Sequence, residues 1–496
     1  MDIITASTPM IITFSIYLIA MVTIGILAYY LTTNFNDYIL GGRKIGSIVT
    51  ALSAGASDMS AWLLLGLPGA FYLLGFSEVW IAVGLLVGAW CNWQFIAARL
   101  RIYTEIARNA LTIPDYFTHR FNDSKRVLSI ISSLVILLFF TIYCASGISA
   151  GAQIFHTTFG FSYLNALFLG ASVTILYTFL GGFLAVSWTD AIQATLMLFA
   201  LIVTPVLIII YMGGFSEVSE IMYSNFPNHN NLMPTGGYIA IISSLGWGLG
   251  YFGQPHILSR FMAASSIPTI NRAKKIGLTW MALCLVGAMA IGYLGLAYLT
   301  KNPQLAGSVV HNPERIFIQL SMVLFNPWMA GVILSAILAA VMSTLSSQLL
   351  ICSSSLTQDF YKNFLRPSAC QKELVLVSRF MVLMVAMIAC ILALNPNNSI
   401  LSLVSYAWAG LGASFGPVIL LSLTWKKMTR NGALAGMIVG AATVVIWKSF
   451  AWLGLYELIP AFIISILAIV IVSLLEKNPD PQLEKIFIES NQKFNE

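Results

Sequence analysis

Charged side chains are scarce in this sequence, and their scarcity excludes an ordinary soluble protein. Only 9% of the 496 residues are Asp, Glu, Lys or Arg, whereas 58% are hydrophobic. Soluble domains carry about 25% charged residues. A membrane protein buries apolar surface in lipid, so this length does not indicate several soluble domains. The composition therefore predicts a single helical body in a bilayer.

Residues that commonly carry enzyme or metal chemistry are also few. The five histidines are scattered and form no HExxH motif, and the six cysteines contain no CxxC pair. No GxxxxGK[ST] loop is present, which argues against an ATP-driven pump. The formal charge of +6 could suggest an acidic partner such as nucleic acid. The sequence shows neither a basic face nor aromatic residues placed to stack on bases, so nucleic acid is not an expected partner.

Long apolar segments fill most of the chain. A helix needs about 20 residues to cross a bilayer, and thirteen segments are long enough. They cover approximately residues 9–30, 46–73, 79–99, 127–152, 162–184, 187–212, 237–257, 276–300, 328–352, 374–394, 399–424, 431–450 and 455–475. An odd number of crossings places the two termini on opposite sides of the membrane.

Lysine and arginine predict which side is cytoplasmic, because basic loops are retained there. Of the 25 basic residues, only Lys301, Arg315 and Lys448 fall on one side of the thirteen-helix arrangement. The other side holds the basic loops at 43–44, 99–126, 260–275, 362–372 and 426–430, and the tail with Lys477. The pattern predicts an external N-terminus and a cytoplasmic C-terminus.

The second segment contains a polar stretch, SAGASDMSAW, at residues 53–62. Its serines, glycine and aspartate weaken helix propensity near the middle of the membrane. A helix break frees carbonyl oxygens beside the Asp58 carboxylate, and oxygen ligands suit hard cations. An aspartate at helix centre costs about 2.5–3.5 kcal/mol. The stretch predicts an alkali-cation site; the alternative is a neutral carboxyl in a small-residue helix interface.

The seventh segment is interrupted as well, by SSLGWGLGYFGQPH at residues 243–256. Two disrupted segments in corresponding positions of two halves indicate a transporter site at the membrane midplane. The second and seventh segments are five apart, which predicts two inverted five-helix repeats at 46–212 and 237–424, flanked by 1–45 and 425–496. The alternative is that the glycines serve close packing and the aromatics face lipid.

The ninth segment ends in a hydroxyl-rich run, AAVMSTLSSQLLICSSS, at residues 339–355. Ser343 and Thr344 could complete the oxygen shell of a cation. Hydroxyls in membrane helices most often bond to their own backbone, so the run alone leaves both interpretations open.

The run YTFLGGFLAVSWTDAIQ at residues 177–193 resembles the sodium/solute symporter family. DYILGGR (37–43), LTIPDYFTHRF (111–121) and SAGASDMSAW are similar to other signatures of that family, and the likeness covers essentially the whole chain. The three interrupted or hydroxyl-rich runs are most similar to its proline-carrying members. The resemblance implies an all-α leucine-transporter-type fold with a 5+5 inverted repeat, and sodium-coupled uptake of L-proline by alternating access.

The family motifs also imply roles for individual residues. Na+ would lie between the second and ninth segments, near Asp58 and Ser60, held by Ala56, Met59, Ala340, Ser343 and Thr344. L-Proline would lie near Trp62, Tyr143, Trp247, Tyr251 and Pro255. Arg43 and Asp190 match coupling or gating positions at the cytoplasmic side, with a topology anchor and a hairpin cap as the alternatives. Ala61 stands where the family usually has glycine.

The expected partners are therefore L-proline, the sodium ion and the lipid bilayer, in a chain that functions as a monomer in a bacterial cytoplasmic membrane. Another small solute, or a proton in place of sodium, is the alternative within the transporter class. A transporter-like membrane sensor is the alternative from another class, and the lack of a kinase-like extension argues against it. Uptake against a gradient would separate a symporter from a passive channel.

Overall fold

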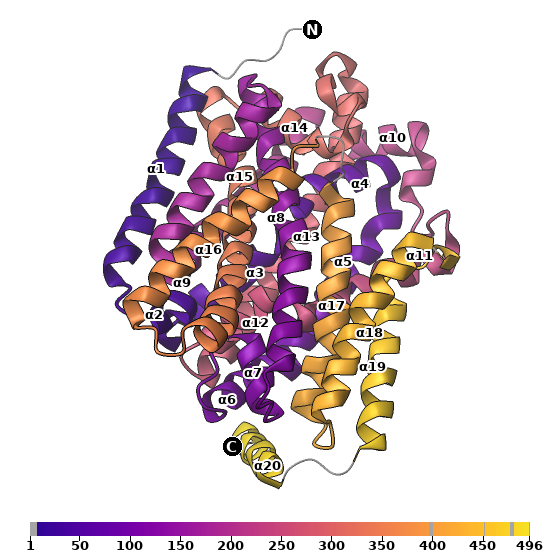
Figure 1. The fold of residues 1–496 in the computed structure, drawn as a ribbon. Coiled ribbons are helices and arrows are strands. Elements are labelled where there is room, and N and C mark those ends of the chain that lie inside the picture. The colour runs from indigo at the N-terminus through magenta and orange to yellow at the C-terminus, as the bar shows by residue number, and fades with distance from the viewer. Residues whose placement is uncertain (1–6, 396–399, 451, 477–480, 496) are drawn as a thin grey trace.

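The computed structural model describes residues 7–395, 400–450, 452–476 and 481–495. Over these ranges the chain is helical, and the β structure consists of an isolated bridge between Ile45 and Ala264. Ten helical stretches are long and apolar enough to cross a membrane. The predicted all-helical membrane class is thereby confirmed. The described chain begins with α1 at one end of the molecule and finishes with α20 at the other (Figure 1).

The helices of the first half carry six of the thirteen predicted crossings. Their bounds are α1 Thr8–Leu31, α2 Phe35–Leu40, η1 Gly41–Arg43, α3 Ser47–Asp58, η2 Trp62–Gly66, α4 Leu67–Leu74, η3 Gly75–Glu78, α5 Val79–Cys91, η4 Asn92–Ala97, α6 Ala98–Ile106, α7 Ile113–Arg120, α8 Val127–Phe159, α9 Tyr163–Met212, α10 Phe215–Asn225 and η5 Pro227–Asn230.

The second half continues in the same manner. Its helices are α11 Gly237–Leu245, η6 Gly246–Gly253, α12 Pro255–Ala263, α13 Ile267–Lys301, η7 Pro303–Leu305, η8 Gly307–Val310, η9 Pro313–Arg315, α14 Ile316–Leu324, α15 Pro327–Ser354, η10 Ser355–Leu365, α16 Gln371–Leu392, α17 Ile400–Thr424, α18 Arg430–Phe450, η11 Trp452–Gly454, α19 Leu458–Leu475 and α20 Pro481–Asn495. Residue 399, predicted to open the eleventh segment, and Lys477 of the tail lie outside the described residues.

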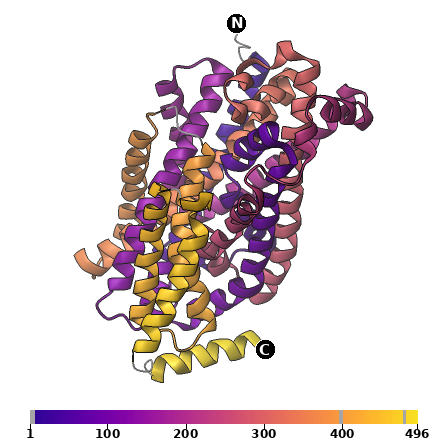
Figure 2. The same cartoon turned by 90° about the vertical axis from the view of Figure 1, so that its right-hand side faces the viewer.

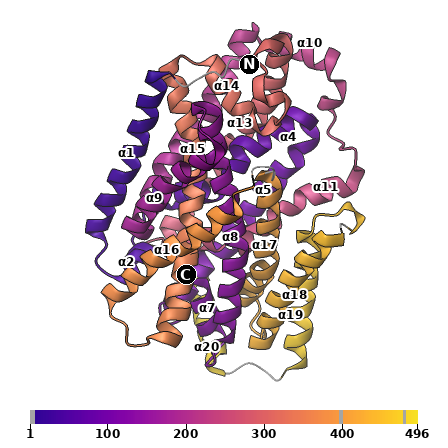
Figure 3. The same cartoon turned by 45° about the horizontal axis from the view of Figure 1, so that its top comes forward.

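Burial separates central helices from peripheral ones. The most apolar window of the α15–η10 stretch is 89% buried and that of α17 is 83% buried, whereas those of α1 and α18 are only 28% buried. α1 lies along one edge of the molecule, and the α18–α19 pair lies along the opposite edge (Figures 1 and 3). The short helix α20 crosses the end of the bundle and contacts α6 (Figure 2). The core is thus built around α15 and α17.

The predicted fifth and sixth segments form a single stretch, α9, which changes direction at Gly182. Gly182 has φ 57° and ψ −143°, which is not helical. A Cβ atom at this position would lie 2.7 Å from the Tyr38 carbonyl oxygen, so the close approach of α2 also requires glycine. The bend therefore comes from glycine, which alone adopts this backbone conformation readily.

Both predicted interruptions are present. α3 ends at Asp58, Met59 leaves the helical region with ψ 73°, and the chain resumes as the π-helix η2 at Trp62. In the seventh segment, the 3-10 helix η6 separates α11 from α12. α12 packs directly against α3, so the two interrupted segments lie side by side. The fold thereby gathers backbone groups that are not engaged in α-helices at the centre of the molecule.

Candidate functional site

Four oxygen atoms converge where the end of α3 meets α15. The Ser343 hydroxyl donates to the carbonyl oxygens of Ala56 at 2.8 Å and Ala340 at 3.1 Å. The Thr344 hydroxyl lies 3.4 Å and 3.3 Å from the same two oxygens. The Ala56 carbonyl is free to bond outside its helix because α3 ends two residues later, and the last four carbonyls of a helix lack intrahelical partners. Met59 is the C-cap of this same end. A buried group of neutral oxygens suits a hard cation.

Asp58 joins the two interrupted segments. Its Oδ2 atom accepts a hydrogen bond from the Tyr251 hydroxyl of η6. Its backbone carbonyl accepts from Trp62 Nε1 at 3.0 Å, and the amide of Ser60 lies 2.8 Å from the same oxygen. The Asp58 side chain is only 2% exposed. The carboxylate therefore couples the geometry of the first break to that of the second.

Buried aromatic rings cluster near this carboxylate. The rings of Trp62 and Trp247 are 6.5 Å apart at 40°. The ring of Tyr143, on α8, lies 6.5 Å from that of His256. Trp62, Tyr143, Trp247 and Tyr251 are all buried. The structure thus brings together the side chains that sequence assigned to the solute, closed from solvent.

Pro255 is the first residue of α12 and belongs to the same region. Proline fits the first turn of a helix because its missing N–H would lack a partner there. It restarts the helix after the glycine-rich η6, and it also borders the cavity described below.

Trp408 of α17 belongs to the site and was missed from the sequence. It is 1% exposed, its Nε1 donates to the Trp247 carbonyl at 2.8 Å, and its ring packs edge-on to Tyr251 at 5.1 Å. The one signal in the sequence is a tryptophan within the glycine-rich run AWAGLGASFG at residues 407–416. Its contacts come from a distant segment, so local pattern could not assign them.

Asp190 forms a buried ion pair with Arg260. Arg260 Nη2 lies 3.1 Å from Asp190 Oδ2, and both side chains are at most 1% exposed. The Ser53 hydroxyl donates to Asp190 Oδ2 at 2.7 Å, and Arg260 also donates to Ser347 Oγ at 2.5 Å. Asp190 lies inside α9, so a hairpin cap is wrong for this residue. The basic pattern predicts Arg260 in a cytoplasmic loop, whereas the structure buries it in α12.

Arg43 closes one end of the same bundle. It donates to the carbonyl oxygens of Met262 and Ala110, each at 2.7 Å, to Asn109 Oδ1 at 2.8 Å and to Thr104 Oγ1 at 3.2 Å. Burial lowers the pKa of Arg43 to about 10, which leaves the guanidinium charged at neutral pH. These hydrogen bonds connect the start of the second predicted segment to the chain that follows the third and the seventh segments.

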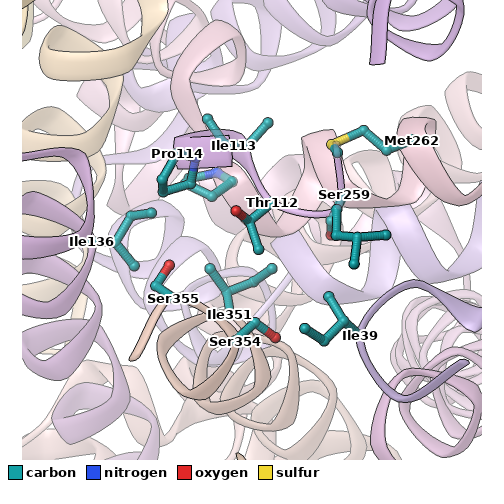
Figure 4. A pocket seen from close by; sticks show the side chains of 12 residues that line it. Ile39, Thr112, Ile113, Pro114, Ile136, Ser259, Met262, Ile351, Ser354 and Ser355 are labelled. Atoms are coloured by element: carbon teal, nitrogen blue, oxygen red, sulfur yellow. The ribbon is translucent and has the colours of Figure 1, made fainter. Parts of the chain in front are cut away.

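A small cavity is lined by Pro255 and by Met262, the residue whose carbonyl accepts from Arg43 (Figure 4). Its volume is about 10 Å³, close to the size of one water molecule. Its walls come from α2, α7, α8, α12, α15 and η10. The lining residues are Ile39, Leu111, Thr112, Ile113, Pro114, Ile136, Pro255, Ser259, Met262, Ile351, Ser354 and Ser355. The cavity is therefore bordered mainly by apolar side chains, with hydroxyls of Thr112, Ser259, Ser354 and Ser355 among them.

Two interrupted helices that meet around buried oxygens and aromatic rings are typical of a helical membrane transporter. The family model described as the sodium:solute symporter family matches residues 38–440. The chain belongs to this family.

Curated relatives resemble the chain over almost its whole length. It is 62% identical over 488 residues to a sodium/proline symporter of Salmonella typhimurium, covering 98% of this chain and 97% of the relative. It is 61% identical to a sodium/proline symporter of Escherichia coli, with the same coverage. It is 51% identical to a high-affinity proline transporter of Bacillus subtilis, covering 92% of this chain and 96% of the relative.

Solved structures share the fold. An outward-open Na+-coupled sialic acid symporter superposes with a TM-score of 0.81 at 20% identity, covering 96% of this chain and 99% of the other. Mhp1, a nucleobase-cation-symport-1 family transporter, superposes with a TM-score of 0.55 at 15% identity, covering 92% and 99%. At these identities the likeness concerns the architecture alone.

Proposed function

We propose that this protein carries L-proline into the cell together with sodium by alternating access. Relatives that match nearly the full chain at 61–62% identity are named sodium/proline symporters. The observation that carries the proposal is the convergence of the Ala56 and Ala340 carbonyls with the Ser343 and Thr344 hydroxyls at the helix break. Transport, rather than catalysis, is the activity.

Sodium occupies this oxygen group in our proposal, with the Met59 carbonyl as a further ligand. In that arrangement the hydroxyl oxygens of Ser343 and Thr344 turn their lone pairs to the ion, and the bonds they now donate are given up. Asp58 adds negative charge nearby, and Ser60 belongs to the same break. Oxygen ligands in a partly unwound helix suit a weakly held ion that must be released in every cycle.

Proline lies against Trp62, Tyr143, Trp247 and Tyr251 in our proposal, next to Pro255. Buried aromatic rings match its apolar five-membered ring. Backbone groups freed by the two breaks are available for its carboxylate and ammonium groups. Because Tyr251 bonds to Asp58, ordering of the sodium break also sets the position of an aromatic wall.

We further propose thirteen crossings arranged as a 5+5 inverted repeat at 46–212 and 237–424, with the N-terminus outside and the C-terminus cytoplasmic. The 50 residues of α9 support this count, because a helix of that length extends about 75 Å, more than twice the thickness of the hydrocarbon layer. Its bend at Gly182 then separates two crossings. The chain acts as a monomer in a bacterial cytoplasmic membrane.

In this mechanism, external sodium binds first, orders the break after Asp58 and completes the proline pocket. The bundle formed by the interrupted helices then rocks against the remaining helices and opens toward the cytoplasm, past the cavity of Figure 4. Arg43 and the Asp190–Arg260 pair hold the inner side closed until then. Inward movement of one sodium ion contributes about 2.3 kcal/mol per 100 mV, in addition to its concentration gradient.

The test is uptake of labelled L-proline into proteoliposomes with an imposed sodium gradient, comparing the native protein with Asp58→Asn. Glu217→Gln serves as the control because Glu217 pairs with Lys301 on an exposed surface. We expect sodium-driven accumulation in the native protein and the control, and its collapse in Asp58→Asn. If a proton gradient without sodium drives the same accumulation, the coupling ion is the proton and not sodium. Equilibration without accumulation would point to a channel.

A further inference from the structure

One carboxylate oxygen of Asp58 is not used by the contacts described above. Oδ2 accepts from Tyr251, but Oδ1 has no hydrogen-bond partner among the described residues. Burial of a carboxylate oxygen without a partner is costly in free energy. The side chain therefore needs another polar contact to hold it beside the helix break.

Asn92 is a second buried polar side chain with unused hydrogen-bonding groups. Neither its Nδ2 nor its Oδ1 has a partner in the described part of the chain, and the residue is 1% exposed. It is the first residue of the π-helix η4, and π-helical turns within α-helices occur frequently at functional sites. An asparagine amide in an apolar crossing requires a partner for the same reason as Asp58.

The helix face that carries Asn92 points into the bundle. Gly84, Gly88 and Asn92 are spaced by four residues, so they lie along one side of the helix. A Cβ atom at Gly88 would lie 2.1 Å from the Gly248 carbonyl oxygen, and one at Gly84 would lie 2.5 Å from that of Leu245. Gly84 therefore presses against the end of α11 and Gly88 against η6, and Asn92 continues the same side by one turn.

Asp58 and Asn92 line the same small cavity. Its volume is about 20 Å³, and a cavity needs about 10–15 Å³ to hold one water molecule. Tyr251 and Met59 also line it, together with apolar side chains of α3 and α13. Two residues with unpartnered polar atoms, Asp58 and Asn92, thus border a space of water size.

We propose that Asn92 is a positioning residue for Asp58 and acts through one water molecule in this cavity. The water accepts a hydrogen bond from Asn92 Nδ2 and donates to Asp58 Oδ1. With Tyr251 on Oδ2, both carboxylate oxygens are then held, and the break at Met59 is held with them. The inference rests on the proposed role of Asp58 in sodium coupling. It assigns to the third crossing an indirect part in sodium affinity, exerted through Asp58.

The experiment measures the sodium concentration that gives half-maximal proline uptake in proteoliposomes. Asn92→Leu keeps the side-chain size and removes both the N–H donors and the carbonyl acceptor of the amide. We expect it to raise that concentration about tenfold. The KM for proline at saturating sodium should stay within about twofold of the native value. Gln94→Leu is the matched control, because Gln94 lies in the same π-helix but is exposed and bonds to Lys274.

Three results would overturn the proposal. Asn92→Leu could leave the sodium dependence unchanged, or raise the proline KM at saturating sodium, which would make Asn92 a solute contact. It could also lower the number of sodium ions carried per proline, which would make Asn92 an ion ligand. If Asn92→Leu does not reach the membrane, Asn92→Ala removes the same groups and decides by the same criteria.

Asp58→Asn is measured in parallel. Its failure to change sodium dependence would contradict the proposed function itself, independently of Asn92.

Discussion

Two opposite charges, Asp190 and Arg260, lie against each other in the interior of the bundle. Removal of one partner from a buried pair leaves an uncompensated charge, which costs about 3–5 kcal/mol. We expect Asp190→Asn to lower the thermal unfolding midpoint strongly, and Asp190→Asn with Arg260→Gln to recover much of the loss. The measurement is thermal unfolding in detergent. Lys301→Gln, which breaks the exposed pair with Glu217, should leave the midpoint unchanged.

If the double variant is no more stable than Asp190→Asn alone, the ion pair is not what stabilises this part of the bundle. The hydroxyls of Ser53 and Ser347, which also contact the pair, would then become the next groups to test.

The hydroxyls of Ser343 and Thr344 carry a second prediction at this scale. Changing either residue to alanine removes one proposed sodium ligand. A loss of about 1.4 kcal/mol in the binding free energy of sodium corresponds to a tenfold change in affinity. We expect Ser343→Ala and Thr344→Ala each to raise the half-saturating sodium concentration at least tenfold in uptake assays. Ser353→Ala is the control, because its hydroxyl bonds to the Leu350 carbonyl of its own helix at 2.9 Å. An equal effect of the control would contradict a specific sodium role.

At the scale of elements, the contact between α5 and η6 decides how the second break is held. The backbones touch at Gly88 and Gly248, and a Cβ atom on Gly88 would meet the Gly248 carbonyl at 2.1 Å. Backbone cannot move aside as a flexible side chain can. The glycines therefore allow the third crossing to support a segment that has too few helical hydrogen bonds of its own.

Gly88→Ala should accordingly displace η6, reduce proline uptake by at least tenfold and destabilise the protein by about 1–3 kcal/mol. Uptake and thermal unfolding are the two measurements. Gly147→Ala on α8 is the matched control, since its Cβ would lie 3.7 Å from Leu345 Cβ, an ordinary contact. Full activity of Gly88→Ala would show that the two helices separate without consequence for the site.

At the scale of the whole molecule, the proposed orientation places Cys370 in the cytoplasm and Val310 outside. Cys370 is an exposed free thiol, and the Val310 side chain is 68% exposed. In intact cells, a membrane-impermeant maleimide should label Val310→Cys in a Cys370→Ser background, and should label Cys370 in the native protein only after the membrane is permeabilised. The opposite labelling pattern would invert the topology.

The sequence by itself determined the membrane class, most helix positions and both interruptions, because these depend on local properties. The cost of polar groups in hydrocarbon and the weak helix propensity of glycine and serine act within a few residues. The stretches at 53–62 and 243–256 therefore predicted breaks that the structure contains. Membership of the sodium:solute symporter family followed from such local runs as well.

Only the tertiary structure decided which groups meet. Ser343 bonds to the carbonyl of a residue 287 positions away, and Trp408 reaches Trp247 across 161 positions. Arg260 illustrates the limit best. As the first residue of the basic loop at 260–275 it is predicted to be a cytoplasmic charge, whereas the fold buries it against Asp190. The partner of a buried charge depends on how distant helices pack, and that packing depends on interactions over the whole bundle. A single stretch of sequence therefore does not determine which residue the charge will pair with.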